Sequence, residues 1–519
     1  MKITKFKIKN YRLLKDFELD LEEELSLVIG KNNCGKTSFL SVLDKFLNKP
    51  APNSFSFDDF NIDFQKQLKE LVDDISEDSP IPYMGISLKL FIKYEEADNL
   101  ANISEVMMDL DPDNNFIVLL FEYYLPEDSL RKLIPDFKVF KTRKTVGDAN
   151  EKEFDQNMFN DYLRKNHMKY FKISKKSLAY DTASGHELED TYIDIIKDKI
   201  RLDKILSFKI ISAKRDVSNK DSDKTLSLLS SEYYEKRENA ENESKEIQKF
   251  KDTLSNTDEH LNKIYSDLFK KVIKNVYQFG GIKKGDSIIK VISTLQHKEL
   301  LKGNTTVMYD HQEDHSLPEN YNGLGYLNLI SMIFKIEVLI SEFRKDGNDN
   351  EEPADVNLLF IEEPEAHTHP QMQYVFIRNI KDILINASNG KDGTKFNLQT
   401  IITTHSSHIT AESKFNDIKY FYNKDKNEVI TKNLKDLEEE YNKEGEIQNF
   451  KFLKQYLTLN RAELFFADKA IFIEGDTERI LLPAMMQIID QEDKLEENKN
   501  IPLLSQNISI VEVGAYCYR

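Results

Sequence analysis

The residues best suited to chemistry near the start of the chain form the stretch GKNNCGKTS at positions 30–38. Gly30, Gly35, Lys36 and Thr37 have the G-x-x-x-x-G-K-[ST] spacing of a phosphate-binding loop. In such a loop the backbone N–H groups surround the phosphates, while the lysine meets a phosphate oxygen and the hydroxyl meets Mg²⁺. The spacing therefore predicts an ATP site. The other loop residues that we place at this site are Asn32, Asn33 and Ser38.

The elements predicted on either side of this loop fit a nucleotide site. The apolar stretch LSLVIG (25–30) is typical of a buried strand, and apolar residues recur at helical spacing through TSFLSVLDKFL (37–47). A helix that begins directly after the loop turns its N-terminal N–H groups and its positive dipole end toward bound phosphates. A chance match in a turn is the alternative, and the strand and helix together argue against it.

Two adjacent carboxylates, Glu362 and Glu363, end a second apolar strand within VNLLFIEEPEAHTHP (356–370). Adjacent strand residues point to opposite faces, and open α/β sheets bind ligands at the carboxyl ends of their strands. We therefore expect one carboxylate to hold Mg²⁺ through water and the other to reach the water that attacks a γ-phosphate. Taken alone, the stretch would be better explained as an acidic strand end before a turn at Pro364.

A third apolar strand, TIITTHSSHI (400–409), carries His405 at its end. A histidine at such a position can hydrogen-bond a γ-phosphate or the attacking water. A lone histidine after a strand is usually structural, but this one follows the acidic strand in the order that a nucleotide-binding sheet supplies. The helical stretch PQMQYVFIRNIKDILI (370–385) lies between the two strands and predicts the crossover of a βαβ unit.

Composition limits the class of protein. A length of 519 residues predicts two or three domains, and 40% hydrophobic with 31% charged residues is ordinary for a soluble chain. We find no apolar run of the about 18 residues that a membrane span needs, and the N-terminus alternates like a strand instead of forming a signal peptide. The two cysteines, Cys34 and Cys517, fit a reducing compartment, so we expect a cytoplasmic protein.

The net charge of −18 means that any DNA site is a local basic patch. Candidate patches, each mixing Lys or Arg with aromatic residues, lie at 137–148, 163–177 and 269–285. Such charged runs are more often solvated faces than nucleic-acid sites. DNA is the expected partner through one or more of these patches, and solvated faces stay the alternative for each.

These motifs, together with YNGLGYLNLI (321–330), resemble in content and order the α/β ATPase heads of ABC and SMC type. They are most similar to the overcoming lysogenization defect (OLD) family of ATP-dependent nucleases, which the Gabija nuclease subunit also resembles. In such heads two subunits sandwich ATP, so the resemblance implies at least a homodimer. The loop offered to the partner subunit's ATP would contain Asn322, Gly323 and Gly325.

The resemblance also implies roles for single residues. Lys36 and Thr37 would bind phosphate and Mg²⁺, and Glu362 would assist the metal. Glu363 would be the hydrolytic base and His405 the switch histidine. Three features depart from the family pattern. Asn33 stands where glycine is common, although Asn adopts left-handed conformations more readily than most residues. Glu362 replaces an aspartate, and the stretch 321–330 lacks the usual serine.

The stretch ADKAIFIEGDTERILLPAMM (467–486) is the third group with chemical potential. Its strand ends at Glu474, and Glu478 follows at the predicted start of a helix, which resembles the opening of a Toprim domain. By that resemblance Glu474 acts as metal ligand or general acid/base, and Glu478 assists a metal. A Toprim fold also needs an Asp-x-Asp pair for two-metal cleavage, and none follows Glu474. We expect a fragment of a longer nuclease; a degenerate Toprim unit is the alternative.

The predicted organisation is a head whose N-terminal part spans 1–215, with strands and helices inserted at about 60–205. The polar segment 216–277 favours helix and predicts either arms that pair with a second subunit or a single solvated hairpin. The C-terminal part of the head would span 278–462, and the N-terminal portion of a Toprim domain 463–519.

The function implied by the resemblance is an ATP-regulated, Mg²⁺-dependent DNA endonuclease of antiphage defence. We expect this chain to bind ATP, with slow turnover and without DNA cleavage of its own. An accessory defence protein is a further expected partner. Two alternatives stay open: an ABC-type ATPase sensor or scaffold without nuclease activity, and a DNA-repair ATPase of the RecF or SMC kind.

Overall fold

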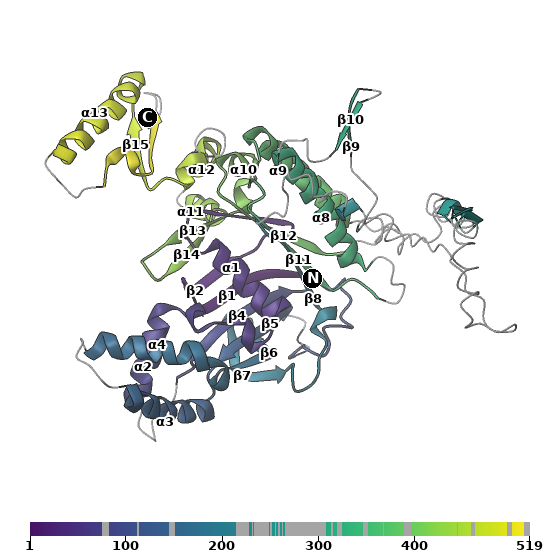
Figure 1. The fold of residues 1–519 in the computed structure, drawn as a ribbon, viewed down its shortest axis with the longest axis vertical. Coiled ribbons are helices and arrows are strands. Elements are labelled where there is room, and N and C mark those ends of the chain that lie inside the picture. The colour runs from purple at the N-terminus through teal and green to yellow at the C-terminus, as the bar shows by residue number, and fades with distance from the viewer. Residues whose placement is uncertain are drawn as a thin grey trace, which may run out of the picture. The chain divides into compact units, whose positions relative to one another are not determined.

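Figure 1 shows the computed structural model of the chain. It describes residues 1–74, 82–109, 111, 114–144, 151–213, 324–345, 351–366, 368–388, 396–443, 445–457, 462–495 and 501–512, with a few short stretches between 228 and 318. The chain forms two compact units, one of Met1–Ala213 with Ala354–Arg519 and one of Lys214–Pro353.

A six-stranded sheet in the order β14-β13-β3-β12-β11-β8 holds the predicted nucleotide motifs. Neighbours pair in parallel except β13 with β14. The central strands β3, β12 and β11 are buried along nearly their whole length because helices and loops cover both faces of such a sheet. In chain order the strands are β3 (Leu25–Gly30), β8 (Leu206–Ile211), β11 (Val356–Glu362), β12 (Leu398–Thr404), β13 (Ile418–Asn423) and β14 (Val429–Asn433).

Helices join these strands as the sequence predicts. Helix α1 (Lys36–Leu43) begins directly after the glycine loop and continues into a π-helical turn, Asp44–Asn48. Its Phe39 is fully buried, with ring centroids 5.9 Å from Phe360 and 6.0 Å from Phe421, so the helix is anchored on β11 and β13. Helix α9 (Pro370–Ser388) forms the crossover between β11 and β12, and the short α10 (Ser407–Glu412) follows β12.

A second, antiparallel sheet has the order β2-β1-β4-β5-β6-β7. The stretches 83–96 and 114–125 supply β4 and β5, as their apolar patterns indicate, and β4 pairs directly with β1. The region interpreted as an insertion therefore extends the sheet that the first two strands begin. The strands are β1 (Lys2–Tyr11), β2 (Leu14–Asp20), β4 (Gly85–Lys93), β5 (Phe116–Tyr124), β6 (Lys172–Asp181) and β7 (His186–Asp194).

Three helices pack together beside this sheet (Figure 1). They are α2 (Ile62–Asp74), α3 (Glu127–Lys144) and α4 (Glu151–Tyr170). One continuous apolar core runs from the first strands through these helices to β11 and β13, and it is rich in stacked and edge-on aromatic rings. Both sheets thus share the core that positions the phosphate loop.

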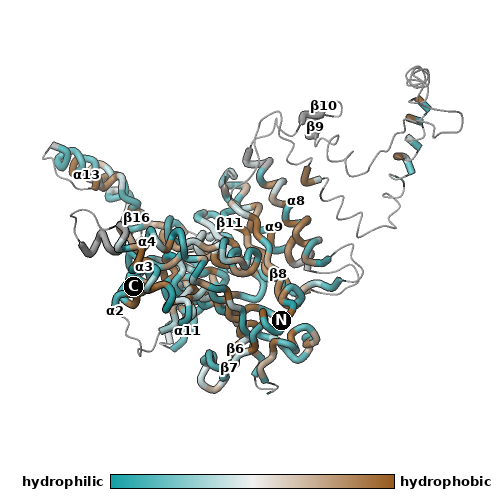
Figure 2. Tube along the Cα trace, turned by 60° about the horizontal axis from the view of Figure 1, so that its bottom comes forward, coloured by the Kyte–Doolittle hydropathy of each residue, from teal (hydrophilic) through white to brown (hydrophobic). Residues whose placement is uncertain are grey.

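The C-terminal residues form a small βαβ unit. Strand β15 (Lys469–Ile473) pairs in parallel with β16 (Ile508–Glu512), and α13 (Asp476–Leu495) connects them. Helix α13 mixes apolar and polar residues along its length (Figure 2). Along the chain, α11 (Asp436–Lys443) and α12 (Ile447–Gln455) come between β14 and this unit.

The unit Lys214–Pro353 is described mainly by α8 (Leu324–Arg344) and by a hairpin of β9 (Met308–Gln312) and β10 (His315–Pro318). Most of the predicted helical segment 216–277 and all of the basic patch 269–285 lie outside the described residues. Across the helices that the structure describes, none combines the length and apolarity that crossing a membrane requires.

Candidate functional site

The glycine loop has the backbone of a phosphate-binding turn. Asn33 and Gly35 have positive φ angles of 61° and 86°, so their N–H groups turn into the curve of the loop. At Gly30 a Cβ atom would overlap the main-chain oxygen of Phe421 and the Sγ of Cys34, which explains the glycine at this position. The left-handed Asn33 agrees with the expectation that asparagine can replace glycine there.

The side chains of the loop are arranged around Lys36, at the start of α1. The ammonium of Lys36 is buried and donates to the main-chain oxygens of Gly30, at 2.8 Å, and Lys31, at 3.0 Å. Burial lowers the pKa of Lys36, while the thiol of Cys34 and nearby carboxylates oppose that shift. Asn32, Asn33 and Thr37 are exposed, and Ser38 is half-exposed.

The histidine at the end of β12 joins the loop lysine to the acidic strand. His405 Nδ1 lies 3.5 Å from Lys36 Nζ, and His405 Nε2 lies 3.2 Å from Glu363 Oε1. Burial and the charge of Lys36 lower the pKa of His405 to about 4. The imidazole is therefore neutral near pH 7. Because Nδ1 faces an ammonium, it accepts, and the proton of the neutral ring lies on Nε2, the nitrogen that faces the carboxylate of Glu363.

The two carboxylates at the end of β11 diverge, as alternation along a strand predicts. Glu362 Oε2 accepts the N–H of Ala213 at 3.1 Å, whereas Glu363 turns toward His405. Glu363 has a φ of 41°, a left-handed conformation that is uncommon for a residue with a side chain. Its N–H donates to Thr403 O at 3.0 Å. Such backbone strain persists where surrounding structure enforces it, and it clusters at functional sites.

A third carboxylate, which sequence reasoning did not single out, lies beside these groups. Glu365 Oε1 accepts the main-chain N–H of His405 at 2.6 Å. Burial raises the pKa of Glu365, and the hydrogen bond from His405 opposes that rise. The only signal in the sequence was one more glutamate in the acidic run after β11.

The predicted magnesium ligands at this site are oxygen donors. The hydroxyl of Thr37 and the carboxylate of Glu362 are of the type that Mg²⁺ prefers. Clusters of three or more His, Cys, Asp or Glu side chains able to hold a metal are absent from the described residues. Two protein ligands suffice for Mg²⁺ at a nucleotide site, since phosphate oxygens and water complete its shell.

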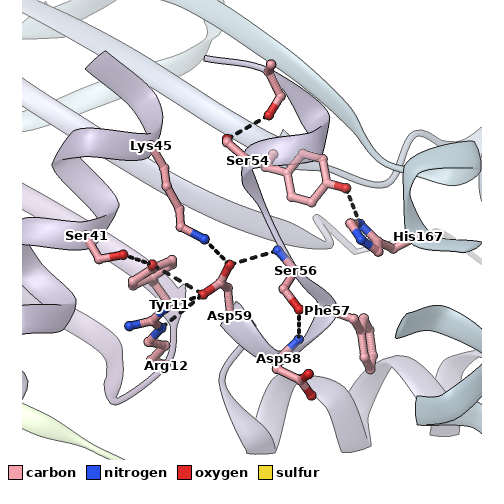
Figure 3. A network of polar contacts seen from close by, with 12 residues as sticks. Tyr11, Arg12, Ser41, Lys45, Ser54, Ser56, Phe57, Asp58, Asp59 and His167 are labelled. Carbon is pink, nitrogen blue, oxygen red and sulfur yellow. Dashed lines mark hydrogen bonds and ion pairs between the residues drawn. The ribbon is translucent and has the colours of Figure 1, made fainter. Parts of the chain in front are cut away.

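Beneath the far end of α1, a buried charge cluster holds the loop helix to the first strands (Figure 3). Asp59 accepts from Arg12 at 2.8 Å, from the N–H of Ser56 at 2.8 Å and from the ammonium of Lys45. Burial acts to raise the pKa of Asp59, but these donors outweigh it and the pKa falls. The hydroxyl of Tyr11 links Asp59, at 3.4 Å, to Ser41 of α1, at 2.8 Å.

The structure describes only part of the loop that we expect to face the partner subunit's ATP. Gly325 lies in the first turn of α8, and Asn322 and Gly323 lie outside the described residues. Their role toward a partner subunit therefore stays a prediction.

The C-terminal βαβ unit carries the other predicted catalytic residues. Glu474 directly follows β15, and Glu478 lies in the first turn of α13, where its carboxylate accepts the N–H of Gly475 at 3.2 Å. Both side chains belong to exposed residues. Glu512 pairs in register with Ile473 at the end of β16, so parallel pairing brings a further carboxylate to the same edge. The sequence alone had not marked Glu512.

One ion pair connects the phosphate loop with this unit. Lys31 Nζ of the loop lies 2.7 Å from Oδ1 of Asp468, the residue before β15. The main-chain oxygen of the same Lys31 accepts from Lys36. The loop that would meet phosphates is thus in direct contact with the strand that leads to Glu474.

The basic patches are partly neutralised where the structure describes them. In the patch 163–177, Arg164 pairs with Asp58 and Asp161, and Lys176 pairs with Glu122. The described part of the patch 137–148 lies on α3. These ion pairs reduce the positive charge that 163–177 offers to a phosphate backbone.

The family comparisons match this arrangement. The chain belongs to the AAA ATPase domain family, whose model matches residues 1–410. Residues 465–518 match the overcoming lysogenization defect protein-like TOPRIM domain. The predicted α/β ATPase head followed by a Toprim domain, and the OLD-type recognition, are confirmed by these two matches. Such domains imply the use of a nucleotide and a divalent metal.

Among known proteins, Endonuclease GajA of Bacillus cereus (strain HuB5-5) is 28% identical over 499 residues, which cover 92% of this chain and 66% of that relative. The chain therefore spans less than two thirds of the length of this relative. Two SMC heads are among the similar solved structures. One is an SMC head bound to the C-winged helix domain of ScpA, with a TM-score of 0.36 and 12% sequence identity. The match covers 84% of this chain and 100% of that SMC head. The head from Thermotoga maritima has TM-score 0.32, 10% identity and coverage of 83% and 99%.

Proposed function

We propose that this chain has the ATPase and Toprim regions of an ATP-regulated DNA endonuclease of antiphage defence. The observation that carries the proposal is the series of close contacts Lys36, His405 and Glu363, in a chain that also has a Toprim match. Lysine, neutral histidine and carboxylate converge where a γ-phosphate and its attacking water would lie. The likeness to an endonuclease supports DNA as the substrate.

In the proposed hydrolysis, Lys36 exchanges the oxygens of Gly30 and Lys31 for phosphate oxygens. Glu363 then orients the attacking water and accepts its proton, while the neutral His405 donates through Nε2 and holds that carboxylate in place. Thr37 and Glu362 would hold Mg²⁺, which neutralises charge on the β- and γ-phosphates. With Lys36 drawn away, Nδ1 of His405 gains room to accept from another donor.

In the proposed DNA cleavage, the carboxylates of Glu474 and Glu478 would hold a divalent metal where β15 ends and α13 begins. Glu512 ends β16 at the same edge of the β15–β16 sheet, where its carboxylate lies 3.8 Å from Arg479 of α13. When bound, Mg²⁺ activates water and stabilises the charge that develops on the scissile phosphate.

The proposed regulation runs through the phosphate loop. The ion pair between Lys31 and Asp468 joins the loop to the Toprim unit, and both side chains are partly exposed. A bound nucleotide brings negative charge close to Lys31, which weakens its attraction to Asp468. We also propose a cytoplasmic homodimer, in which Asn322, Gly323 and Gly325 face the partner's ATP and residues 216–277 contribute to pairing. The domain limits at 215, 277 and 462, and an accessory defence protein as partner, are part of the same proposal.

The test is a plasmid nicking assay with Mg²⁺, with and without ATP, on this chain and on a version that includes any coding sequence after position 519. We expect cutting by the longer version, loss of cutting in Glu474→Ala, and loss of the ATP effect in Lys36→Ala. Asp468→Asn should retain cutting but reduce its response to ATP, with Asp476→Asn as the exposed control in the same unit. Absence of cutting in every version, with ATP still bound, would instead support an ATPase sensor or scaffold.

A further inference from the structure

The carboxylate of Glu365 is directed at the main chain of the histidine, not at its ring. Glu365 lies in the turn after β11, and its Oε1 accepts the N–H of His405 at 2.6 Å. The other oxygen, Oε2, is buried. A hydrogen bond between an ionised carboxylate and a backbone N–H is stronger and shorter than one between neutral groups. Glu365 therefore ties the acidic turn of β11 to the end of β12.

The residues around His405 show why this tie matters. The next residue, Ser406, caps α10 by accepting the N–H groups of His408 and Ile409, and its hydroxyl donates to Gln373 at 2.6 Å. The position of the chain after His405 is thus set by α9 and α10. The main-chain N–H of His405 lies between the end of β12 and the start of α10, and Glu365 accepts its hydrogen bond.

The imidazole of His405 has little freedom to move without losing a contact. Its two nitrogens bridge Lys36 and Glu363, which belong to different elements. Because a side chain follows its own main chain, a shift of the His405 backbone would break one of these contacts. Catalytic geometry tolerates little displacement, and a shift of about 1 Å can lower a rate by about a hundredfold.

We infer that Glu365 is a positioning residue for ATP hydrolysis, which fixes the main chain of His405 and thereby holds its imidazole between Lys36 and Glu363. The inference rests on the proposed ATPase function. Glu365 acts through His405, and its role requires a hydrogen-bond acceptor at Oε1 more than a negative charge. The carboxylate also lies close enough to Lys36 to favour its charged form, which the test must separate from positioning.

The test compares Glu365→Ala and Glu365→Gln by ATP turnover, nucleotide affinity and thermal stability. Alanine removes the acceptor, so we expect kcat to fall by at least about tenfold with nucleotide Kd little changed. Glutamine keeps an acceptor oxygen and should restore turnover to within about threefold of the unaltered chain. The matched control is Glu412→Gln, which removes an ion pair with Arg378 between the same helices, α9 and α10, and should leave kcat unchanged.

A double-mutant cycle with His405→Ala decides whether Glu365 acts through the histidine. We expect Glu365→Ala to have no further effect on kcat in that background. Equal loss in the alanine and glutamine variants, or additive loss in the double variant, would overturn the inference.

A second readout does not depend on turnover. In ¹³C-histidine spectra the His405 signal, assigned by its loss in His405→Ala, should titrate well below the ordinary histidine range in the unaltered chain. Glu365→Ala should move that titration upward, because the released ring leaves Lys36 and meets water. An unchanged titration would contradict the inference. If the unaltered chain neither binds nor hydrolyses ATP, the proposed function fails, while the spectra still decide the contact between Glu365 and His405.

Discussion

His405 Nε2 and Glu363 Oε1 lie 3.2 Å apart, although 42 positions separate the two residues in the chain. They meet because β11 and β12 pair in parallel, with Glu362 opposite Thr403, so both strands end at the same edge. The neutral ring faces the carboxylate of Glu363, a residue with a left-handed backbone conformation. This contact, with Lys36 on the other ring nitrogen, defines the candidate hydrolytic centre.

Lys36→Ala should abolish ATP binding. Lys36 is the buried ammonium at the centre of the loop, and its removal leaves the phosphates without their charged donor. We expect nucleotide Kd to rise by about a hundredfold or more in a fluorescence titration. Lys49→Ala is the matched control, because Lys49 is exposed after the same helix and pairs only with Asp44 among the described residues. Unchanged affinity in Lys36→Ala would remove the phosphate-loop assignment.

Glu363→Gln should bind ATP normally and hydrolyse it slowly. The amide retains the shape of the side chain and can accept from His405, but it cannot take a proton from water. We expect kcat to fall by about two orders of magnitude with Kd for ATP unchanged. Glu362→Gln is the comparison, and its effect should depend on Mg²⁺ concentration. Normal turnover in Glu363→Gln would transfer the base role to another residue.

The low pKa of His405 should make the folded chain less stable as pH falls. The pKa is about 4 in the folded chain and 6.5 for an ordinary histidine, so the unfolded chain binds more protons between these values. The contribution of His405 to the free energy of unfolding is therefore fully present above pH 6.5 and declines as the pH falls toward 4. Thermal melts between about pH 7 and pH 5 should show a smaller loss in His405→Gln than in the unaltered chain. Equal losses of stability in His405→Gln and the unaltered chain would mean that another group causes the pH dependence.

Asp59→Ala should destabilise the fold strongly, whereas Asp58→Ala should not. The carboxylate of Asp59 is 3% exposed and accepts from Arg12, Lys45 and the N–H of Ser56, so its removal leaves these donors without their acceptor at a cost of about 1 to 3 kcal/mol. Asp58 and its partner Arg164 are about half exposed, and such a pair contributes about 0 to 1 kcal/mol. Urea unfolding of the two variants provides the comparison. Similar losses at both positions would contradict the structural role of the cluster around Asp59.

Local patterns predicted the elements that position much of the candidate nucleotide site. The loop spacing from Gly30 to Thr37, the apolar runs of β3, β11 and β12, and the helical spacing of α1 and α9 are properties of short segments. Their order along the chain was enough to predict one parallel sheet with Glu363 and His405 at the same edge. Strand ends meet at one edge wherever parallel strands pair, so this prediction needed no side-chain contacts.

Other features could not be read from short segments. One example is the pairing of β4 with β1, which extends the antiparallel sheet. This pairing depends on which of several apolar strands meet during packing. The role of Glu365 depends on a single contact with the main chain of His405, and a third glutamate after a strand carries no sign of it. The same holds for Glu512, which reaches the edge near Glu474 only through the register of β16 against β15.

The sequence by itself determined the kind of site: residue type and local spacing decide which backbone turns, helix starts and strand ends can form, and these suffice for a phosphate loop and an acidic strand. Only the tertiary structure decided which charged groups touch. Lys31 meets Asp468, Asp59 meets Arg12 and Lys45, and Glu365 meets His405 across long separations in the chain. Such contacts follow from the packing of whole elements around a shared core, and that packing has no local pattern.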